Sequence, residues 1–400
     1  MWRLGFFFHE MGFGLLSIFL PLYIMSIAST NGLFYIGLMS ALALFLAMPA
    51  SFFWGWSCDK TKHYKRYILI SFIASTIILY LLTLTNSAEL LVLLYAVMSI
   101  LHVAHEPPKN VLIAEMYSRE DWEKSFARYE GFTEVGWLIG LLLGFFTSIY
   151  NVNPTNTLIL CSALNLVAFL ASLVLVTDPS LIFERGLVSI EKSVDFACRG
   201  VFVASKIFDG IPVNEKLKRE NLRAFCTGLI LFSLATSILF TPMPVFISKI
   251  VADTSLPQSL VFAIFVLNSG GGVVGYFLAG SRSGQTTGKS RVARIVLLRS
   301  VLAFLLMAIL QTSTYSVVLV TSILILMGFA YALFLVHTLS LSMELIPAGR
   351  AGLFNVLVGV GGACGSFIGP YIAQTFSFFS IFVTAGIIFL ITYVTFKVFV

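Results

Sequence analysis

Four ionisable side chains share one face of a long apolar segment in the first third of the chain. They are His102, His105, Glu106 and Lys109. At about 100° per residue these positions fall on a single helical face. Ionisable groups inside a membrane helix are costly unless they line a polar cavity or meet partners. The face therefore either lines a pathway for a solute or protons, or forms a polar seam between two helices.

Further titratable groups are expected at a similar depth in neighbouring segments. Counting about 1.5 Å per residue from the expected cytosolic ends, His9, Glu10 and Glu130 fall level with Glu106. Glu134 lies one helical turn beyond Glu130, on the same face. These residues extend the polar face of the fourth segment to the first and fifth segments.

Carboxylates and imidazoles held in a low-dielectric site can load and release protons near neutral pH. We therefore interpret Glu106 as the first candidate for a proton-coupling carboxylate, followed by Glu10 and Glu134. His102 and His105 are candidate proton relays or hydrogen-bond donors to a substrate, and satisfied structural histidines are the alternative.

Lys109 has three possible roles: an ion pair with Glu106, an ion pair with Glu130, or a site for an anionic group. The preceding pair Pro107-Pro108 is expected to loosen the helix, because proline lacks a backbone N–H. Carbonyl groups freed there could face a cavity.

These residues must be positioned by membrane-spanning helices. Of 400 residues, 58% are hydrophobic and 11% are charged, which excludes an ordinary soluble domain. Apolar stretches long enough to cross a lipid bilayer recur along the whole chain. We expect an all-α polytopic protein with twelve spans, at about 4–28, 32–56, 66–86, 88–114, 124–149, 155–177, 222–248, 256–280, 292–313, 315–345, 350–374 and 376–398.

The distribution of basic residues predicts the orientation. With a cytoplasmic N-terminus, the outside loops carry one basic residue, Lys249, and the other basic residues of the loops fall in inside loops. Both termini are then cytoplasmic, and the plasma membrane is the expected location. The net charge of +6 reflects this topology signal and indicates no nucleic-acid partner. The five cysteines are scattered, so neither a metal site nor a cofactor is expected.

The chain is expected to consist of two related halves. Residues 1–177 and 222–400 would each form a six-helix bundle, joined by a cytosolic linker over 178–221 with an amphipathic helix near 187–208. Glu115 and Glu344 end corresponding spans in the two halves. The interval in residue number between these two glutamates also relates two Gly-x-x-x-Gly pairs, and such pairs let helices approach closely. The pairs are Gly136 with Gly140, and Gly365 with Gly369.

The second half offers mainly neutral polar groups within its spans. We expect the spans of the second half to be nearly free of charge. The polar groups that they offer are Asn268, His337, Asn355 and Gln374. Under the interval between the halves, His337 falls next to Glu106 and is expected to face the same cavity from the other side. A structural histidine is the alternative.

The loop between the second and third spans carries a motif, G-x-x-x-D-[RK]-x-G-[RK]-[RK], in modified form. Gly55, Asp59 and Lys60 match it, Lys62 stands at the second glycine, and the basic pair Lys65 and Arg66 arrives two residues late. With its twelve spans, the chain resembles the major facilitator superfamily. The resemblance implies two pseudo-symmetric six-helix bundles, alternating access, a monomer, and a gating role for Asp59 supported by Lys60, Lys65 and Arg66.

Two departures from the family pattern concern the mechanism. Many proton antiporters of the family have an arginine early in helix 4, where Tyr95 stands here, and the Gly-Pro pair of their helix 5 appears in helix 11 as Gly369-Pro370. At the cytosolic ends of the fourth and tenth spans, Glu115 and Glu344 are expected to act as gate residues. Their expected partners are Arg119 and Arg350.

These observations predict a secondary transporter of a small organic solute, with protons as the coupling ion. Efflux of lipophilic compounds is the first candidate, and uptake of a sugar or an organic acid is the second. An enzyme is not expected, because no H-E-x-x-H motif, nucleophile elbow or phosphate-binding loop occurs. A non-transporting membrane sensor or scaffold is the remaining alternative.

Overall fold

The protein is described by a computed structural model that covers residues 2–28, 31–116, 122–178, 222–281, 288–311, 317–345 and 352–399. All regular structure in these residues is helical, and the described part contains twelve helical segments long and apolar enough to span a membrane. The predicted number of spans is therefore confirmed. The linker over 178–221, with its expected amphipathic helix, lies outside the described residues from position 179 onward.

In the first half the spans are α1 (Arg3–Ile27), α2 (Gly32–Thr61), α3 (Tyr64–Leu82), the fourth span described below, α6 (Trp122–Ile149) and α7 (Pro154–Leu175). In the second half they are the seventh span, also described below, and α11 (Pro257–Ser281), α12 (Gly288–Gln311), α13 (Val317–Leu345), α14 (Gly352–Thr375) and α15 (Phe378–Phe399).

Two spans are broken near prolines. The fourth consists of α4 (Ala88–His102), a single 3₁₀ turn η1 (Val103–His105) and α5 (Glu106–Met116). Pro107 and Pro108 fall in the first turn of α5, where their missing N–H groups leave no hydrogen bond unmade. The seventh span likewise consists of α9 (Leu222–Phe240) and α10 (Met243–Ile250). The expected interruption at Pro107-Pro108 is confirmed.

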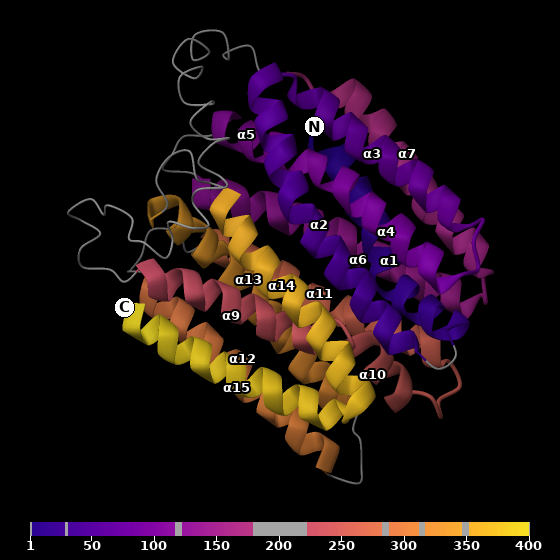
Figure 1. Ribbon diagram of the computed structural model, residues 1–400, viewed down its shortest axis with the longest axis vertical. Coiled ribbons are helices and arrows are strands. Elements are labelled where there is room, and N and C mark those ends of the chain that lie inside the picture. The colour runs from indigo at the N-terminus through magenta and orange to yellow at the C-terminus, as the bar shows by residue number, and fades with distance from the viewer. Residues whose placement is uncertain are drawn as a thin grey trace.

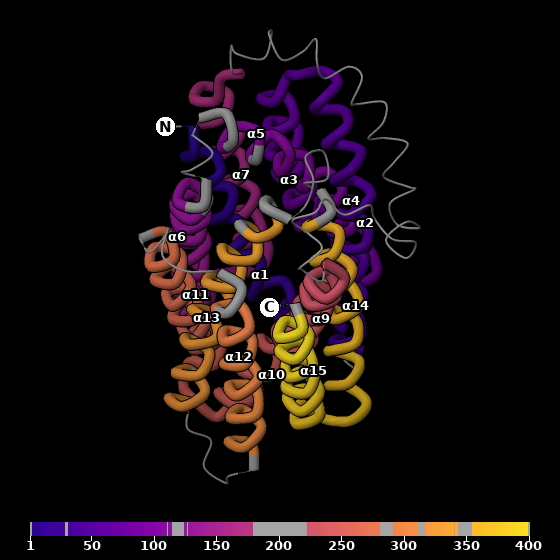
Figure 2. Tube along the Cα trace, turned by 90° about the vertical axis from the view of Figure 1, so that its left-hand side faces the viewer, coloured from indigo at the N-terminus to yellow at the C-terminus, as the bar shows by residue number. Residues whose placement is uncertain are grey.

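The helices of the two halves lie on opposite sides of the molecule. The first half runs from indigo to magenta and the second half from coral red through orange to yellow in Figure 1. They meet along α2 against α14 and along α6 against α11. Within each half, α1 packs against α6 and α7, whereas α9 packs against α14 and α15. Figure 2 shows the same bundle from the side, with α10 at the end of α9 that faces away from the C-terminus.

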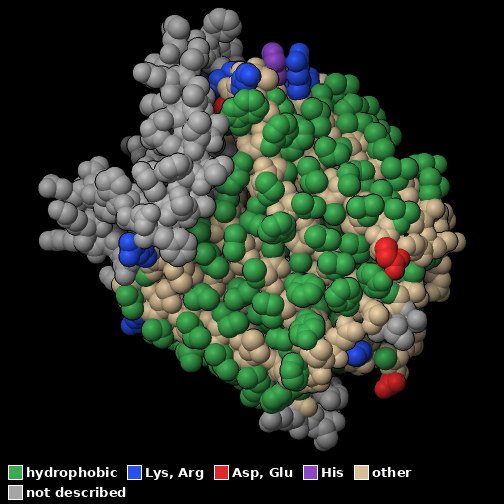
Figure 3. All heavy atoms as spheres, in the orientation of Figure 1, with side chains coloured by type: hydrophobic (Ala, Val, Ile, Leu, Met, Phe, Trp, Pro, Cys, Tyr) green, Lys and Arg blue, Asp and Glu red, His purple; other side chains and the backbone are tan. Residues whose placement is uncertain are grey.

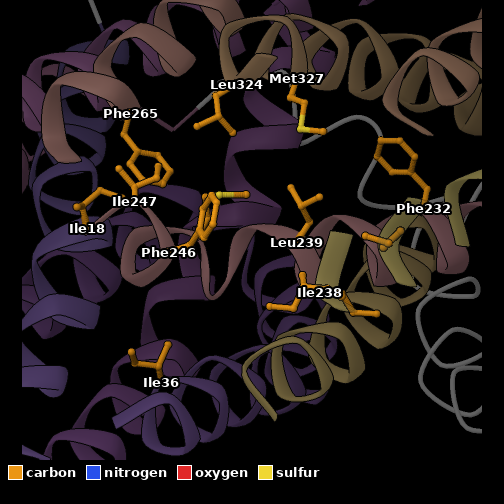
Figure 4. Packing of buried hydrophobic residues seen from close by; sticks show 14 of the residues in the cluster. Ile18, Ile36, Phe232, Ile238, Leu239, Phe246, Ile247, Phe265, Leu324 and Met327 are labelled. Carbon is orange, nitrogen blue, oxygen red and sulfur yellow. The ribbon is translucent and has the colours of Figure 1, made fainter. Parts of the chain in front are cut away.

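Apolar side chains form the core and also cover the outer surface. In Figure 3 they cover the middle of the visible face, while most charged side chains lie toward its edges, as expected for a bundle surrounded by lipid. Inside, one buried cluster includes side chains from both halves. Figure 4 shows Ile18 of α1 beside Ile247 of α10 and Phe265 of α11.

The predicted glycine pairs bring helices into backbone contact at equivalent places in the two halves. On α6, Gly140 lies against the carbonyl of Met11 in α1. On α14, Gly369 lies against the carbonyl of Ile238 in α9. A Cβ atom at either glycine would collide with the facing backbone, so neither helix pair could stay this close with a larger residue.

We predict that Gly140→Ala destabilises the fold by about 1–3 kcal/mol, because the added methyl group must displace the α1 backbone. The measurement is the thermal unfolding midpoint of the purified protein in detergent. Gly270→Ala is the matched control, since a Cβ there meets only Leu138 Cδ1, at 3.8 Å. Equal midpoints for the two variants would contradict the close packing described for α1 and α6.

Candidate functional site

Polar side chains of α1, the broken fourth span and α6 gather inside the first half. At the centre, Lys109 Nζ lies 2.6 Å from Glu106 Oε2 and 3.8 Å from Glu130 Oε1. The Lys109 side chain is 11% exposed, so its charge is poorly hydrated and depends on these carboxylates. Of the three roles expected for Lys109, the structure places it in ion pairs with both glutamates.

A second group of contacts fixes the tautomer of His9. Asn165 Nδ2 donates to the carbonyl of Cys161 at 2.9 Å, which orients the amide so that its Oδ1 faces His9 Nδ1 at 2.6 Å. Since this oxygen only accepts, His9 Nδ1 carries the proton. A neutral His9 then has a free Nε2, which accepts from His102 Nδ1 at 3.1 Å. This arrangement joins α1, α4 and α7.

The same reasoning places a proton between His105 and Glu106. His105 Nδ1 lies 2.6 Å from the carbonyl of His102, so this nitrogen donates. Ser71 Oγ also donates to that carbonyl, and lies 3.1 Å from His105 Nδ1. His105 Nε2 faces Glu106 Oε1 at 3.3 Å. Two lone pairs would repel at this distance, so either the imidazole or the carboxyl group is protonated.

The carboxylates of this region outnumber the positive charges near them. Glu10 interacts electrostatically with Glu106, Glu130, Glu134 and Lys109. If all four carboxyl groups were ionised, the cations that the described ion pairs place within 4 Å of them would be Lys109 and, when protonated, His105. Excess like charge in a low-dielectric interior is strongly unfavourable, so we infer that the cluster retains protons on its carboxyl groups.

Two cavities lie between the halves, and one glutamate of the cluster reaches each of them. A cavity of about 360 Å³ is lined by Glu106 of α5 and by residues of α2, α9, α13 and α14, including Asn355. A second cavity, of about 440 Å³, is lined by Glu134 together with Asn268 and Ser269 of α11. By contrast, His9 and His105 are almost fully buried, with 0% and 1% of their surface exposed. The histidines therefore stand behind the wall that the glutamates form.

Contacts to α11 connect this site with the second half. Ser269 Oγ donates to Glu134 Oε1 at 2.6 Å, across the interface between α6 and α11. Asn268 Nδ2 donates to the carbonyl of Leu324 at 2.5 Å, which holds α11 against α13. His337 is not brought to either cavity. It lines a separate cavity of about 720 Å³ with Arg291 and Arg294, so the expectation that it shares a cavity with Glu106 is wrong.

The loop of the sequence motif is a tight turn. Lys62 follows the last residue of α2 with φ = 58°, a left-handed conformation that normally favours glycine. This is the position at which the motif has its second glycine. Lys60 Nζ lies 5.0 Å from the centre of the Trp56 ring, and the Lys65 amide donates to Asp178 Oδ1 at 2.8 Å.

The gating roles of Asp59, Lys60, Lys65 and Arg66 stay predictions. Glu115 and Glu344 lie in α5 and α13, but their side chains are outside the described part of the structure, as is all of Arg350.

The sequence analysis overlooked one charged residue inside the second half. Arg299 lies in the middle of α12 and is fully buried, with 0% of its surface exposed. The expectation that these spans are nearly free of charge is therefore corrected. The signal was visible in the sequence, because Arg299 lies well inside the apolar segment 292–313, whereas Arg294 lies near its start.

The described residues contain one group with the spacing of a metal site. The ring nitrogens of His9, His102 and His105 lie within 4.8 Å of one another. The hydrogen bonds described above already engage these imidazoles with one another and with protein oxygens. We therefore assign the trio to the polar network of the first half.

Comparison with known proteins places this arrangement in context. A family model described as Major Facilitator Superfamily matches residues 4–357. The crystal structure of the human organic anion transporter MFSD10 (TETRAN) superposes with a TM-score of 0.70 at 14% identity, covering 99% of this chain and 97% of that one. The nucleoside transporter NupG superposes with a TM-score of 0.68 at 14% identity, covering 99% and 97%. No curated protein sequence matched the chain.

We predict that Lys109→Met destabilises the protein by about 3 kcal/mol, because it removes the cation that two partly buried carboxylates share. The measurement is the thermal unfolding midpoint in detergent. The double variant Lys109→Met/Glu106→Gln should recover part of the loss, since one of the two unpaired carboxylates is then gone. Additive effects of the two substitutions would contradict the pairing.

We also predict that Lys62→Gly raises the free energy of unfolding by up to about 1 kcal/mol, because glycine adopts the left-handed conformation without strain. Lys62→Ala is the matched control: it removes the same charge but keeps the Cβ atom. A higher unfolding midpoint for the alanine variant than for the glycine variant would exclude backbone strain at this turn.

Proposed function

Because the chain belongs to the major facilitator superfamily, we propose that it is a secondary active transporter that moves a small organic solute across the plasma membrane by alternating access, with protons as the coupling ion. Similarity to the two solved transporters establishes the fold alone. The proposal about coupling depends on the charges and cavities of this chain.

The close approach of His105 Nε2 to Glu106 Oε1, at 3.3 Å, is the observation that carries the proposal. Glu106 lines the cavity between the halves, while His105 stands behind it and is shielded from solvent. A carboxyl group at this boundary can exchange a proton with the cavity, and Lys109 beside it can stabilise the ionised form. Binding or release of the proton then changes the charge of the cavity wall, which can bias one conformation over the other.

Contacts between the halves support alternating access. At the end of the bundle that faces away from both termini, Gln374 Nε2 donates to Asn31 Oδ1 at 3.3 Å. Nearby, Gly37 packs so closely on Pro370 that an added Cβ would lie 3.2 Å from the proline ring. The cavity lined by Glu106 lies nearer the other end, beside Asn355 in the first turn of α14. With the proposed orientation, the closed end is extracellular and the hollow faces the cytoplasm.

Efflux of lipophilic compounds is the substrate class we place first, because apolar side chains make up most of the wall of the Glu106 cavity. Uptake of a sugar or an organic acid is the second candidate, supported by the polar groups Ser233, Thr236 and Asn355 on the same wall. A membrane sensor or an enzyme would need no proton-dependent solute movement, and the experiment below distinguishes these classes.

We predict that the purified protein, reconstituted in vesicles, accumulates its solute against a gradient when a pH difference is imposed. The solute would be identified by a susceptibility screen of cells with and without the gene. Glu106→Gln should abolish accumulation, because the amide cannot carry the exchanged proton, but it should retain exchange of labelled solute at equal concentrations.

Asp253→Asn is the control for loss of a carboxylate, since Asp253 is exposed in the connection between α10 and α11. It should leave accumulation unchanged. Accumulation that is insensitive both to pH and to Glu106→Gln would refute proton coupling at this residue. An absence of any solute movement would refute the transporter proposal itself.

A further inference from the structure

Arg299 is buried at a place where its charge is expensive. It lies at the middle of α12, with no surface exposed, and it is the largest fully buried side chain in the described residues. Arginine keeps its charge in proteins, so burial cannot be relieved by loss of a proton. A charged group inside a membrane protein is normally paired, coordinated by carbonyls, or functional.

The guanidinium group has no hydrogen-bond acceptor among the described residues. Its Nε, Nη1 and Nη2 atoms are all buried and unpaired. Aromatic rings surround it instead, with the guanidinium carbon 5.0 Å from the ring centres of Phe232 and Phe389, and 5.5 Å from those of Phe240 and Tyr331. Cation–π contacts offset part of the cost of burial but supply no acceptor for the N–H groups.

A second unpaired donor lies on the helix that supplies two of these rings. Phe232, Thr236 and Phe240 are spaced four residues apart, so they share one face of α9. The Thr236 hydroxyl group is also buried without a hydrogen-bond partner in the described residues. The face therefore carries an unsatisfied hydroxyl between the two phenylalanines that contact Arg299.

This unsatisfied group stands directly behind the cavities between the halves. Phe232, Thr236 and Tyr331 line the cavity of about 360 Å³ that Glu106 also lines. Thr236 and Phe240 line the neighbouring cavity of about 440 Å³. The rings of Phe232, Phe240 and Tyr331 thus lie around the guanidinium group and also line the space in which the solute is proposed to bind.

We propose that Arg299, assisted by Thr236, binds the anionic group of the transported solute, so that the substrate class is an amphipathic organic anion. A carboxylate, sulfonate or phosphate offers several acceptor oxygens and no competing donor. Acceptors are what the unpaired guanidinium and hydroxyl groups lack. The rings around Arg299 would contact the apolar body of the solute. This inference rests on the proposed transport function where it calls the bound anion a substrate. The binding site itself does not depend on that function.

The two halves would then have different roles. The negative group of the solute would approach Arg299 on the second half, across the cavity from Glu106. When Glu106 is protonated, it does not repel the anionic group of the solute. When Glu106 is ionised, the two negative charges repel each other. Charge complementarity of this kind joins solute binding to the proton without direct contact between them.

The experiment measures the thermal unfolding midpoint of the full-length protein in detergent with three naphthalene probes of the same size. They are 2-naphthalenesulfonate, neutral 2-naphthol and cationic 2-naphthylmethylammonium. The anion should raise the midpoint of the wild-type protein in a saturable way, and the other two should not. Arg299→Met should weaken the apparent affinity for the anion at least tenfold, and Arg299→Lys should weaken it less, because the charge is kept but the planar fork is lost.

Matched variants separate binding from folding. Without any ligand, Arg299→Met should unfold at a temperature equal to or above that of the wild type, since it removes an unsatisfied buried charge. Thr236→Val, which keeps the shape of the side chain, should also weaken anion binding. Lys249→Met is the control, because it removes an exposed lysine whose ammonium lies 5.0 Å from the Phe378 ring, away from the cavities, and should leave binding unchanged.

The inference is overturned if the anion does not stabilise the wild type, or if Arg299→Met keeps the wild-type affinity. A large loss of unliganded stability in both Arg299→Met and Arg299→Lys would assign the arginine to the core instead. The transport proposal can fail separately. Anion binding through Arg299 without proton-driven accumulation would support the binding site and refute the transport proposal. Accumulation that depends on Glu106 but excludes anions would support the transport proposal and refute the anion site at Arg299.

Discussion

Lipid offers a buried charge no water, so each ionised group inside this bundle depends on what the protein places beside it. Lys109 shows one solution: its ammonium group lies 2.6 Å from the Glu106 carboxylate, and Glu130 is also within reach. Arg299 shows another, because among the described residues its guanidinium group contacts aromatic rings and has no hydrogen-bond acceptor. In the first half the buried cation is thus paired with carboxylates, whereas Arg299 in the second half has no hydrogen-bond acceptor among the described residues.

Close helix packing holds the helices of each half in place. Gly140 and Gly369 bring α6 onto α1 and α14 onto α9, so each half can hold its polar groups in a fixed arrangement. The proline pair at the start of α5 interrupts the fourth span beside His105, which places this imidazole and Glu106 on either side of a break in the helix. Rigid halves with an irregular segment at the site are well suited to motion of one half against the other.

Features that depend on residues close together in the chain could be predicted from the sequence. Hydropathy predicted the twelve spans, and helical periodicity placed Glu106 and Lys109 on one face, where they form an ion pair. Partners from distant segments were not accessible, because no periodicity relates His9 to Asn165 or Glu134 to Ser269. These contacts depend on how the helices are rotated about their own axes.

Two errors have distinct physical causes. His337 was placed by the repeat interval, which gives the depth along a helix but not the direction of the side chain; it faces Arg291 and Arg294 instead. Arg299 was overlooked because a lone charge in an apolar span forms no pattern along a helix face, unlike the spaced charges near Glu106. The rule that made the cluster near Glu106 a candidate applies with more force to a lone charge, since a cluster can compensate itself and a single arginine cannot. For that reason the isolated guanidinium group is the better indicator of an external ligand, and the cluster of carboxylates around Lys109 is the better indicator of a group that exchanges protons.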